Sequence, residues 1–228
     1  MSIARHGTGF RASLGAVASQ IHPVFMLPPL AASGFGAVLG GLGAPRLAAL
    51  HLGVAVCALY TAHVKDGLVD FHHRGEDDDH PLTRRGCRLA LAGSTLLFGI
   101  GVVVLGLRVD VVAATLAIPG WLVAVLHAPH SDTNPFGATL GYPVGIGFAL
   151  LGGHYVQSRA LSTTALAFAV VFVVVLAGIK VVDDATDYAY DRSVDKRTVA
   201  VVVGRRRARV VAGALVCAGM VAVAALSV

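Results

Sequence analysis

The chain has 228 residues, of which 56% are hydrophobic and only 14% are charged, and its net charge is +5. Soluble domains carry roughly 25% charged residues, so this composition excludes an ordinary water-soluble protein. Apolar stretches of roughly 20 residues, long enough to cross a bilayer, recur along nearly the whole length. We therefore predict one domain over residues 1–228, an all-α integral membrane protein with about seven transmembrane helices around a lipid-accessible cavity.

Charged and Gly/Pro-rich breaks divide the sequence into seven candidate spans. They lie near residues 14–40, 46–65, 87–107, 110–127, 136–157, 161–182 and 208–227. Arg5 and Arg11 before the first span suggest a signal peptide, but the apolar part continues to about Gly41, which is too long for one. Three scattered cysteines form neither a disulfide framework nor a CxxC site, and we expect Cys57, Cys87 and Cys217 to be small buried side chains.

If the spans alternate, the three longer loops at 66–86, 128–135 and 183–207 fall on the same side as the N-terminus. Fifteen Lys and Arg residues lie on this side, against Arg46, Arg108 and Arg159 opposite. Basic residues near helix ends favour the cytoplasm, so we predict that the N-terminus and these loops are cytoplasmic. The excess of positive charge therefore indicates topology and not nucleic-acid binding.

Eleven of the thirteen acidic residues lie in two of these loops, and only Asp110 and Asp132 lie elsewhere. Asp66 and Asp70, four residues apart at the end of the second span, would share one face of a continuing helix. At the end of the sixth span the same spacing relates several more acidic residues and a lysine. These are Lys180, Asp183, Asp184, Asp187 and Asp191.

Like charges at this spacing repel each other unless a cation lies between them. Oxygen-only ligands favour a hard ion such as Mg²⁺, which keeps positions for water and phosphate oxygens. Two such clusters facing each other would bind a diphosphate through the metal, with Lys180, Lys196 and Arg197 neutralising the remaining charge. Glu76, Asp77, Asp78 and Asp79 lack helical spacing and are expected to be solvated loop charges.

At these motifs the sequence resembles the UbiA family of intramembrane prenyltransferases. The second cluster, DDATDYAYDRSVDKRTVAVVVG, is similar in its aspartate-rich helix end, in Thr198 and in Gly204 six residues later. The first cluster, AHVKDGLVDFHHRGEDDDHPLTRRG, is similar to the family's NxxxDxxxD motif. Ala62 replaces the asparagine, and His80 before Pro81 and His22 before Pro23 stand where arginine is usual. The family usually has nine helices, whereas this chain has about seven spans.

The resemblance implies Mg²⁺-dependent transfer of an isoprenyl group from a polyprenyl diphosphate donor to a lipophilic acceptor within the membrane. It assigns Asp66, Asp70, Asp187 and Asp191 as catalytic metal ligands, with Asp183 as a further metal ligand. Asp184 and Lys180 are expected to assist these ligands in cofactor binding, and Lys180, Lys196 and Arg197 to neutralise the diphosphate. Phe25, Met26 and Tyr142 are candidates for the wall of a prenyl-binding cavity. Tyr188 and Tyr190 would lie near the diphosphate or anchor the interface.

Two alternatives to this function stay open. A CDP-alcohol phosphatidyltransferase also uses intramembrane aspartates, but it groups them in one short signature with an Ala-Arg step that is absent here. A cation-binding transporter would place its ligands near the midplane, whereas these acids lie at the membrane edge. The close histidine pairs, His72 with His73 and His127 with His130, are too few for a di-iron oxidase, so contacts with phosphate or water are expected for them.

Gly137, Gly141 and Gly145 recur at four-residue spacing in the fifth span, with Pro143 between the last two. Small residues on one face of a membrane helix allow close helix packing, which we expect here. The alternative is a kinked wall that shapes a lipid-accessible cavity.

Overall fold

The computed structural model describes residues 2–226, which form helices, short connections and one isolated β-bridge between Ala4 and Leu82. The long helices are α2 (Pro23–Leu39), α3 (Pro45–Val69), α4 (Arg84–Arg108), α5 (Val111–Leu126), α6 (Pro135–Ser158), α7 (Thr163–Thr186) and α10 (Arg205–Leu226). The short helices are α1 (Gly9–Ala18), α8 (Tyr188–Ser193) and α9 (Val199–Val203). Two π-helical turns, η1 (Asp70–Arg74) and η2 (His127–Ser131), extend α3 and α5.

Within residues 2–226, six helices are long and apolar enough to cross a membrane. The pair α1 and α2 makes a seventh span if it is counted as one. The prediction of an all-α membrane protein with about seven spans is therefore confirmed. The predicted end of the last span at residue 227 lies outside the described residues, and the single domain over 1–228 stays a prediction.

The first predicted span, 14–40, is wrong as one continuous helix, because α1 and α2 meet at an angle of 58°. The break comes just before Pro23, the first residue of α2. Proline disfavours helical backbone in the residue before it, and His22 accordingly has φ −109° and ψ 89°. The chain therefore turns at His22 before it enters α2.

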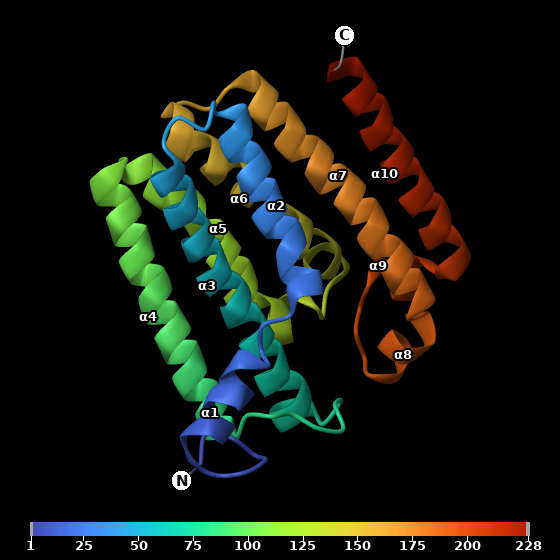
Figure 1. Cartoon of the computed structure of the whole chain (residues 1–228). Helices are drawn as coiled ribbons and strands as arrows, with labels where there is room; N and C mark the ends of the chain where they lie inside the picture. The colour runs from blue at the N-terminus through green and yellow to red at the C-terminus, as the bar shows by residue number, and fades with distance from the viewer. Residues whose placement is uncertain (1, 227–228) are drawn as a thin grey trace.

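The long helices lie side by side, and α3 contacts α2, α4, α5 and α6 (Figure 1). Helix α10 packs along α7 at the edge of the bundle. The α7–α10 connection, which contains α8 and α9, lies at the same end of the bundle as α1 and the loop after α3 (Figure 1). The C-terminal ends of α3 and α7 therefore share one end of the molecule.

Side-chain oxygens begin several of these helices by accepting hydrogen bonds from backbone N–H groups in the first turn. Thr83, Asp110, Asn134 and Ser162 cap α4, α5, α6 and α7 in this way. Proline occupies the first turn of α2, α3 and α6, where its missing N–H costs no intrahelical hydrogen bond. Short polar sequences thus set the helix starts between the apolar spans.

The closest helix approach joins α2 to α6 and does not use the predicted glycine series. A Cβ atom on Gly36 would lie 2.0 Å from the carbonyl oxygen of Leu150, and one on Gly153 would lie 2.1 Å from that of Ser33. Gly145 faces open space and Gly141 has only ordinary neighbours. The expectation of close packing is therefore wrong at Gly141 and Gly145, and Gly145 instead lines an apolar cavity.

Replacing Gly153 with alanine is expected to push α2 away from α6, because the new methyl group would meet backbone atoms that cannot rotate away. Overpacking of this kind costs about 1–3 kcal/mol. The melting temperature of the purified protein in detergent should therefore fall. Gly145→Ala, on the same helix but facing open space, should leave it almost unchanged. Equal melting temperatures for both variants would contradict the close contact.

Candidate functional site

Both aspartate clusters open into one polar cavity of about 220 Å³ at the end of the bundle shared by α3 and α7. Helix α3 contributes Asp66, and Asp70 follows at the start of η1. The end of α7 and the short helix α8 contribute the facing group. It consists of Asp184, Asp187 and Asp191. Five carboxylates from two distant segments of the sequence therefore line one space, and Asp132 adds a sixth.

The α3 residues reach the cavity because the helix continues past its predicted end at residue 65. It runs to Val69 and passes into η1, so Asp66 and Asp70 are one turn apart on the same face. Gly75 then ends η1 with φ 67°, a backbone conformation that favours glycine. This turn places Glu76 beside the cavity, where its backbone N–H donates to the carbonyl oxygen of Asp70.

Two carboxylate oxygens in the cavity wall are buried without a hydrogen-bond partner. They are Oδ1 of Asp66 and Oδ2 of Asp184. Buried polar atoms in folded proteins almost always have a partner, and an unpaired buried carboxylate is costly. A hard cation in the cavity would satisfy both oxygens. The donor set, oxygen atoms only, is the one that Mg²⁺ prefers, so the residues fit this ion.

Two lysines supply positive charge at the same cavity. Lys180 pairs with Asp184 one turn later on α7, and Lys196 forms an ion pair of 3.1 Å with Glu76. Burial by itself lowers the pKa of Lys196, but the hydrogen bond and the negative charge of Glu76 outweigh burial and raise it. Lys196 therefore stays charged beside the carboxylates.

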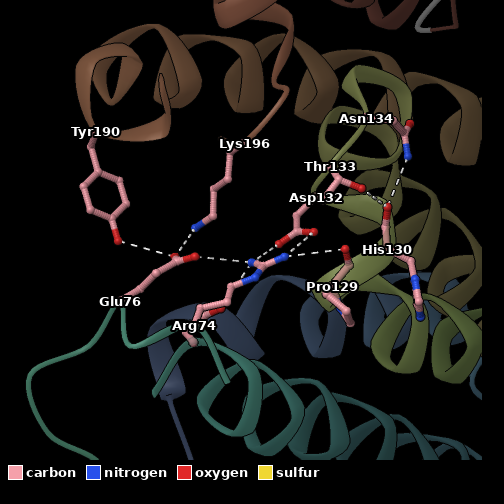
Figure 2. Close-up of polar contacts among 10 residues, drawn as sticks. Arg74, Glu76, Pro129, His130, Asp132, Thr133, Asn134, Tyr190 and Lys196 are labelled. Atoms are coloured by element: carbon pink, nitrogen blue, oxygen red, sulfur yellow. Dashed lines mark hydrogen bonds and ion pairs between the residues drawn. The ribbon is translucent and has the colours of Figure 1, made fainter. Parts of the chain in front are cut away.

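Arg74 connects the first cluster to the loop between α5 and α6, as Figure 2 shows. Its two terminal nitrogens bond both carboxylate oxygens of Asp132, with 3.2 Å between Nη2 and Oδ1. Glu76 lies 3.6 Å from the same guanidinium group and also contacts Lys196 and Tyr190. A bidentate arginine–carboxylate pair fixes the orientation of both side chains as well as pairing their charges. This network therefore holds Asp132 and Glu76 in place at the cavity rim.

The network overturns one expectation, and the cavity lining adds Asp132, which the sequence analysis left out of the site. The Glu76 side chain is only 7% exposed, so the interpretation of Glu76 as a solvated loop charge is wrong. Asp77, Asp78 and Asp79 are exposed as expected. Asp132, His127 and Thr198 line the cavity, and Thr198 donates a hydrogen bond to Asp191. The signal for Asp132 was its position in a loop predicted to lie on the aspartate side.

Two of the assigned residues lie outside the cavity. Asp183 and Arg197 are exposed, and Asp183 points about 100° away around α7 from its buried neighbour Asp184. The remaining assigned residues line one space. They are Asp66, Asp70, Lys180, Asp184, Asp187, Asp191 and Lys196.

An apolar cavity of about 90 Å³ begins one helical turn from the polar one. Ala62 lines the apolar cavity, and Asp66, four residues later on the same face of α3, lines the polar cavity. On α6, Tyr142 likewise lines the apolar cavity, and Ala138, four residues earlier, lines the polar cavity. Of the three candidate wall residues, only Tyr142 lines the apolar cavity, whereas Met26 is buried elsewhere and Phe25 is exposed.

The chain is similar to known proteins in sequence and in fold. The chain is 31% identical over 192 residues to the 1,4-dihydroxy-2-naphthoate octaprenyltransferase of Mycobacterium tuberculosis, and the match covers 76% of this chain and 64% of that relative. The chain thus spans slightly less than two thirds of the relative's length. No protein-family model matches the chain.

Two solved structures have the same fold. A digeranylgeranylglyceryl phosphate synthase aligns with a TM-score of 0.75 at 15% identity, over 92% of this chain and 76% of that one. A UbiA homologue from Archaeoglobus fulgidus, bound to GPP and Mg²⁺, aligns with a TM-score of 0.75 at 14% identity, over 94% and 77%.

The fold and the site define a helical membrane protein with an acidic cavity at one end of its bundle and an apolar cavity beneath it. Together with the sequence similarity, they show that the chain has the fold of UbiA homologues and resembles a prenyltransferase of that type. The predicted resemblance is confirmed. This similarity favours a prenyltransferase over the phosphatidyltransferase and transporter alternatives.

Replacing Arg74 with methionine is expected to destabilise the protein, because it leaves the carboxylates of Asp132 and Glu76 without their shared partner. Leaving such groups unpaired costs about 1–3 kcal/mol. Asp132→Asn in the same chain should recover part of this loss, since the uncompensated charge is then gone. Melting temperatures of the two single variants and the double variant measure this coupling. Strictly additive effects would show that the pair is not coupled.

Proposed function

We propose that the chain transfers an isoprenyl group from a polyprenyl diphosphate to a lipophilic acceptor inside the membrane. The observation that carries the proposal is the adjacency of the two cavities, one lined by six carboxylates and two lysines, the other apolar. An amphiphile with a diphosphate head and a hydrocarbon tail matches this division. The octaprenyltransferase name of the mycobacterial relative and the GPP and Mg²⁺ of the archaeal neighbour support the same chemistry.

Asp66 and Asp70 from one side, with Asp184, Asp187 and Asp191 from the other, would hold Mg²⁺. When bound, Mg²⁺ supplies positive charge that neutralises the negative charge developing on the departing diphosphate. The unpaired oxygens of Asp66 and Asp184 support this assignment, because they are placed to bind an ion without losing an existing hydrogen bond. Asp183 and Arg197, which are exposed, are not part of the proposed site.

Lys180 and Lys196 would face the diphosphate as the bond between its ester oxygen and the allylic carbon breaks. Positive groups placed where negative charge develops stabilise the transition state. Arg74 and Glu76 act as positioning residues, because they orient Lys196 and Asp132 at the rim. The new bond forms between the allylic carbon and the acceptor, which loses a proton.

The apolar cavity would exclude water while the allylic carbon carries positive charge, which protects it from hydrolysis. Ala62 stands at the boundary, where the family motif has asparagine, and it lines the apolar side. Without an amide at this position the hydrocarbon surface reaches to within one turn of Asp66. We propose that this boundary sets where the first prenyl unit lies.

Asp66→Asn is expected to lower prenyl transfer by at least about 100-fold, because it removes a charged oxygen ligand while it preserves shape. Diphosphate release from geranyl and geranylgeranyl diphosphate by the whole chain in nanodiscs, with Mg²⁺ and a membrane lipid extract as acceptor source, measures the effect. Asp183→Asn is the matched control, since Asp183 is exposed beside the site, and it should keep activity within about twofold. Full activity of Asp66→Asn would falsify the metal assignment.

Mg²⁺ binding is expected to release protons and to strengthen as pH rises. Burial raises the pKa of Asp191 above its ordinary value and outweighs the hydrogen bond from Thr198 and the charges of Lys180 and Lys196, which lower it. Burial favours the neutral acid, so in the metal-free protein this group contributes stability at low pH that is lost as pH rises through the folded pKa. The metal requires the carboxylate, so binding must displace the proton.

Calorimetric titration with Mg²⁺ in two buffers of different ionisation enthalpy counts the released protons. Asp191→Asn should release fewer protons than the wild type, by up to about one per ion. Identical proton release by both proteins at every pH would contradict the role of Asp191.

A further inference from the structure

A second group of metal-binding side chains lies outside the polar cavity, between α3 and α4. It consists of His72 in η1, His80 in the following loop and Cys87 in the first turn of α4. One ligand atom from each residue lies within 4.8 Å of the others, and the set is buried or half-buried. Residues 72 and 87 are brought together only because the connection folds back on itself.

The two donor sets differ in chemistry. The polar cavity offers oxygen atoms, whereas this group offers two imidazole nitrogens and one sulfur. Imidazole and thiolate ligands select zinc and similar transition metals and bind Mg²⁺ poorly. We propose that His72, His80 and Cys87 bind a zinc-class transition-metal ion that braces the connection between α3 and α4.

Distances within the group suit such an ion. Nδ1 of His80 lies 3.9 Å from Sγ of Cys87. Zinc bonds of about 2.0–2.3 Å at tetrahedral angles separate ligand atoms by about 3.3–3.6 Å, so a small side-chain movement closes the site. The carbonyl oxygen of Leu82 lies 3.0 Å from Nε2 of His72 and 3.2 Å from Nδ1 of His80. This oxygen, or a water molecule, would be the fourth ligand.

The ring nitrogen of His80 that does not face Cys87 has a hydrogen-bond partner, as the second ring nitrogen of a metal-bound histidine usually does. This nitrogen, Nε2, lies 3.2 Å from Oε1 of Gln20, and in the tautomer that donates this hydrogen bond Nδ1 is unprotonated and able to bind an ion. The backbone N–H of Leu82 donates to the same Nδ1, which is consistent with a lone pair on that nitrogen. Burial also lowers the pKa of His80, so the ring is neutral near pH 7.

An ion at this position would stabilise a segment that serves the polar cavity. The connection between its ligands carries Arg74 and Glu76, which bind Asp132 and Lys196 at the rim. The N-terminal segment closes over the same region, since the backbone N–H of Arg5 donates to Pro81 and that of Thr83 donates to Ile3. His80 also packs directly against Gly67, next to Asp66. The site would thus fix η1 and the loop relative to α4.

Titration of the purified full chain with Co²⁺ tests the proposal without any catalytic assay. The expected result is one equivalent bound with the visible bands of a tetrahedral ion and a cobalt–thiolate charge-transfer band, both displaced by Zn²⁺. Cys87→Ser should remove the thiolate band, and His72→Ala should weaken binding by at least tenfold. Gln20→Leu should weaken it by about tenfold, since partners of this kind contribute about 10–100-fold.

Three matched variants distinguish this site from binding at neighbouring side chains or in the polar cavity. His73→Ala removes an exposed neighbouring histidine, and Cys57→Ser removes another cysteine, so both should keep the full spectrum. Asp66→Asn should also keep it, which distinguishes this site from the proposed Mg²⁺ site. Failure of the proposed transferase activity would therefore leave this result unchanged.

A second measurement on the wild-type chain does not depend on the folding of any variant. Zn²⁺ should slow alkylation of Cys87 by iodoacetamide at least tenfold and slow backbone hydrogen exchange over residues 72–87, with Cys217 as the internal control. Absence of stoichiometric Co²⁺ or Zn²⁺ binding would overturn the proposal. So would a thiolate band that survives Cys87→Ser, or zinc protection that is equal at Cys87 and Cys217.

Discussion

Mutual repulsion among carboxylates at one end of an apolar bundle constrains the rest of this molecule. Six aspartates line one small cavity, and two of their oxygens are buried without a partner. Such an arrangement persists only where positive charge is supplied from all sides. Arg74, Lys180 and Lys196 supply part of it, and each comes from a different segment. The remaining negative charge is what makes the cavity suited to a divalent ion and a diphosphate.

Helix α3 connects this charged end to the apolar interior. One of its faces carries His51, Ala58 and Ala62 along the apolar cavity and then Asp66 and Asp70 along the polar one. The lining changes from Ala62 to Asp66 within a single turn of α3, so the boundary between the apolar and the polar cavity has a fixed position along this helix. Because α3 also packs against four neighbouring helices, this boundary cannot shift independently of the bundle.

The connection between α3 and α4 has two roles in this arrangement. Its first part delivers Arg74 and Glu76 to the cavity rim, and its second part folds beneath the N-terminal segment around His80 and Leu82. The histidines before the two prolines, at positions 22 and 80, both lie outside the lining of the polar cavity. His80 is buried away from the cavity, and the rings of His22 and His63 contact each other at a tilt of 41°, with centroids 4.8 Å apart.

The sequence by itself determined the membrane class, the approximate spans and the pairing of two aspartate motifs, because hydropathy and helical periodicity are local properties of the chain. Asp66, Asp70, Asp187 and Asp191 could be singled out for the same reason. Only the tertiary structure decided that Asp184 faces the cavity while Asp183 does not, since adjacent residues on a helix differ by about 100° in direction. It also decided that Glu76 is buried and that Asp132 pairs with Arg74. Those contacts join loops from different parts of the sequence, and their partners are set by how the helices pack and not by spacing along the chain.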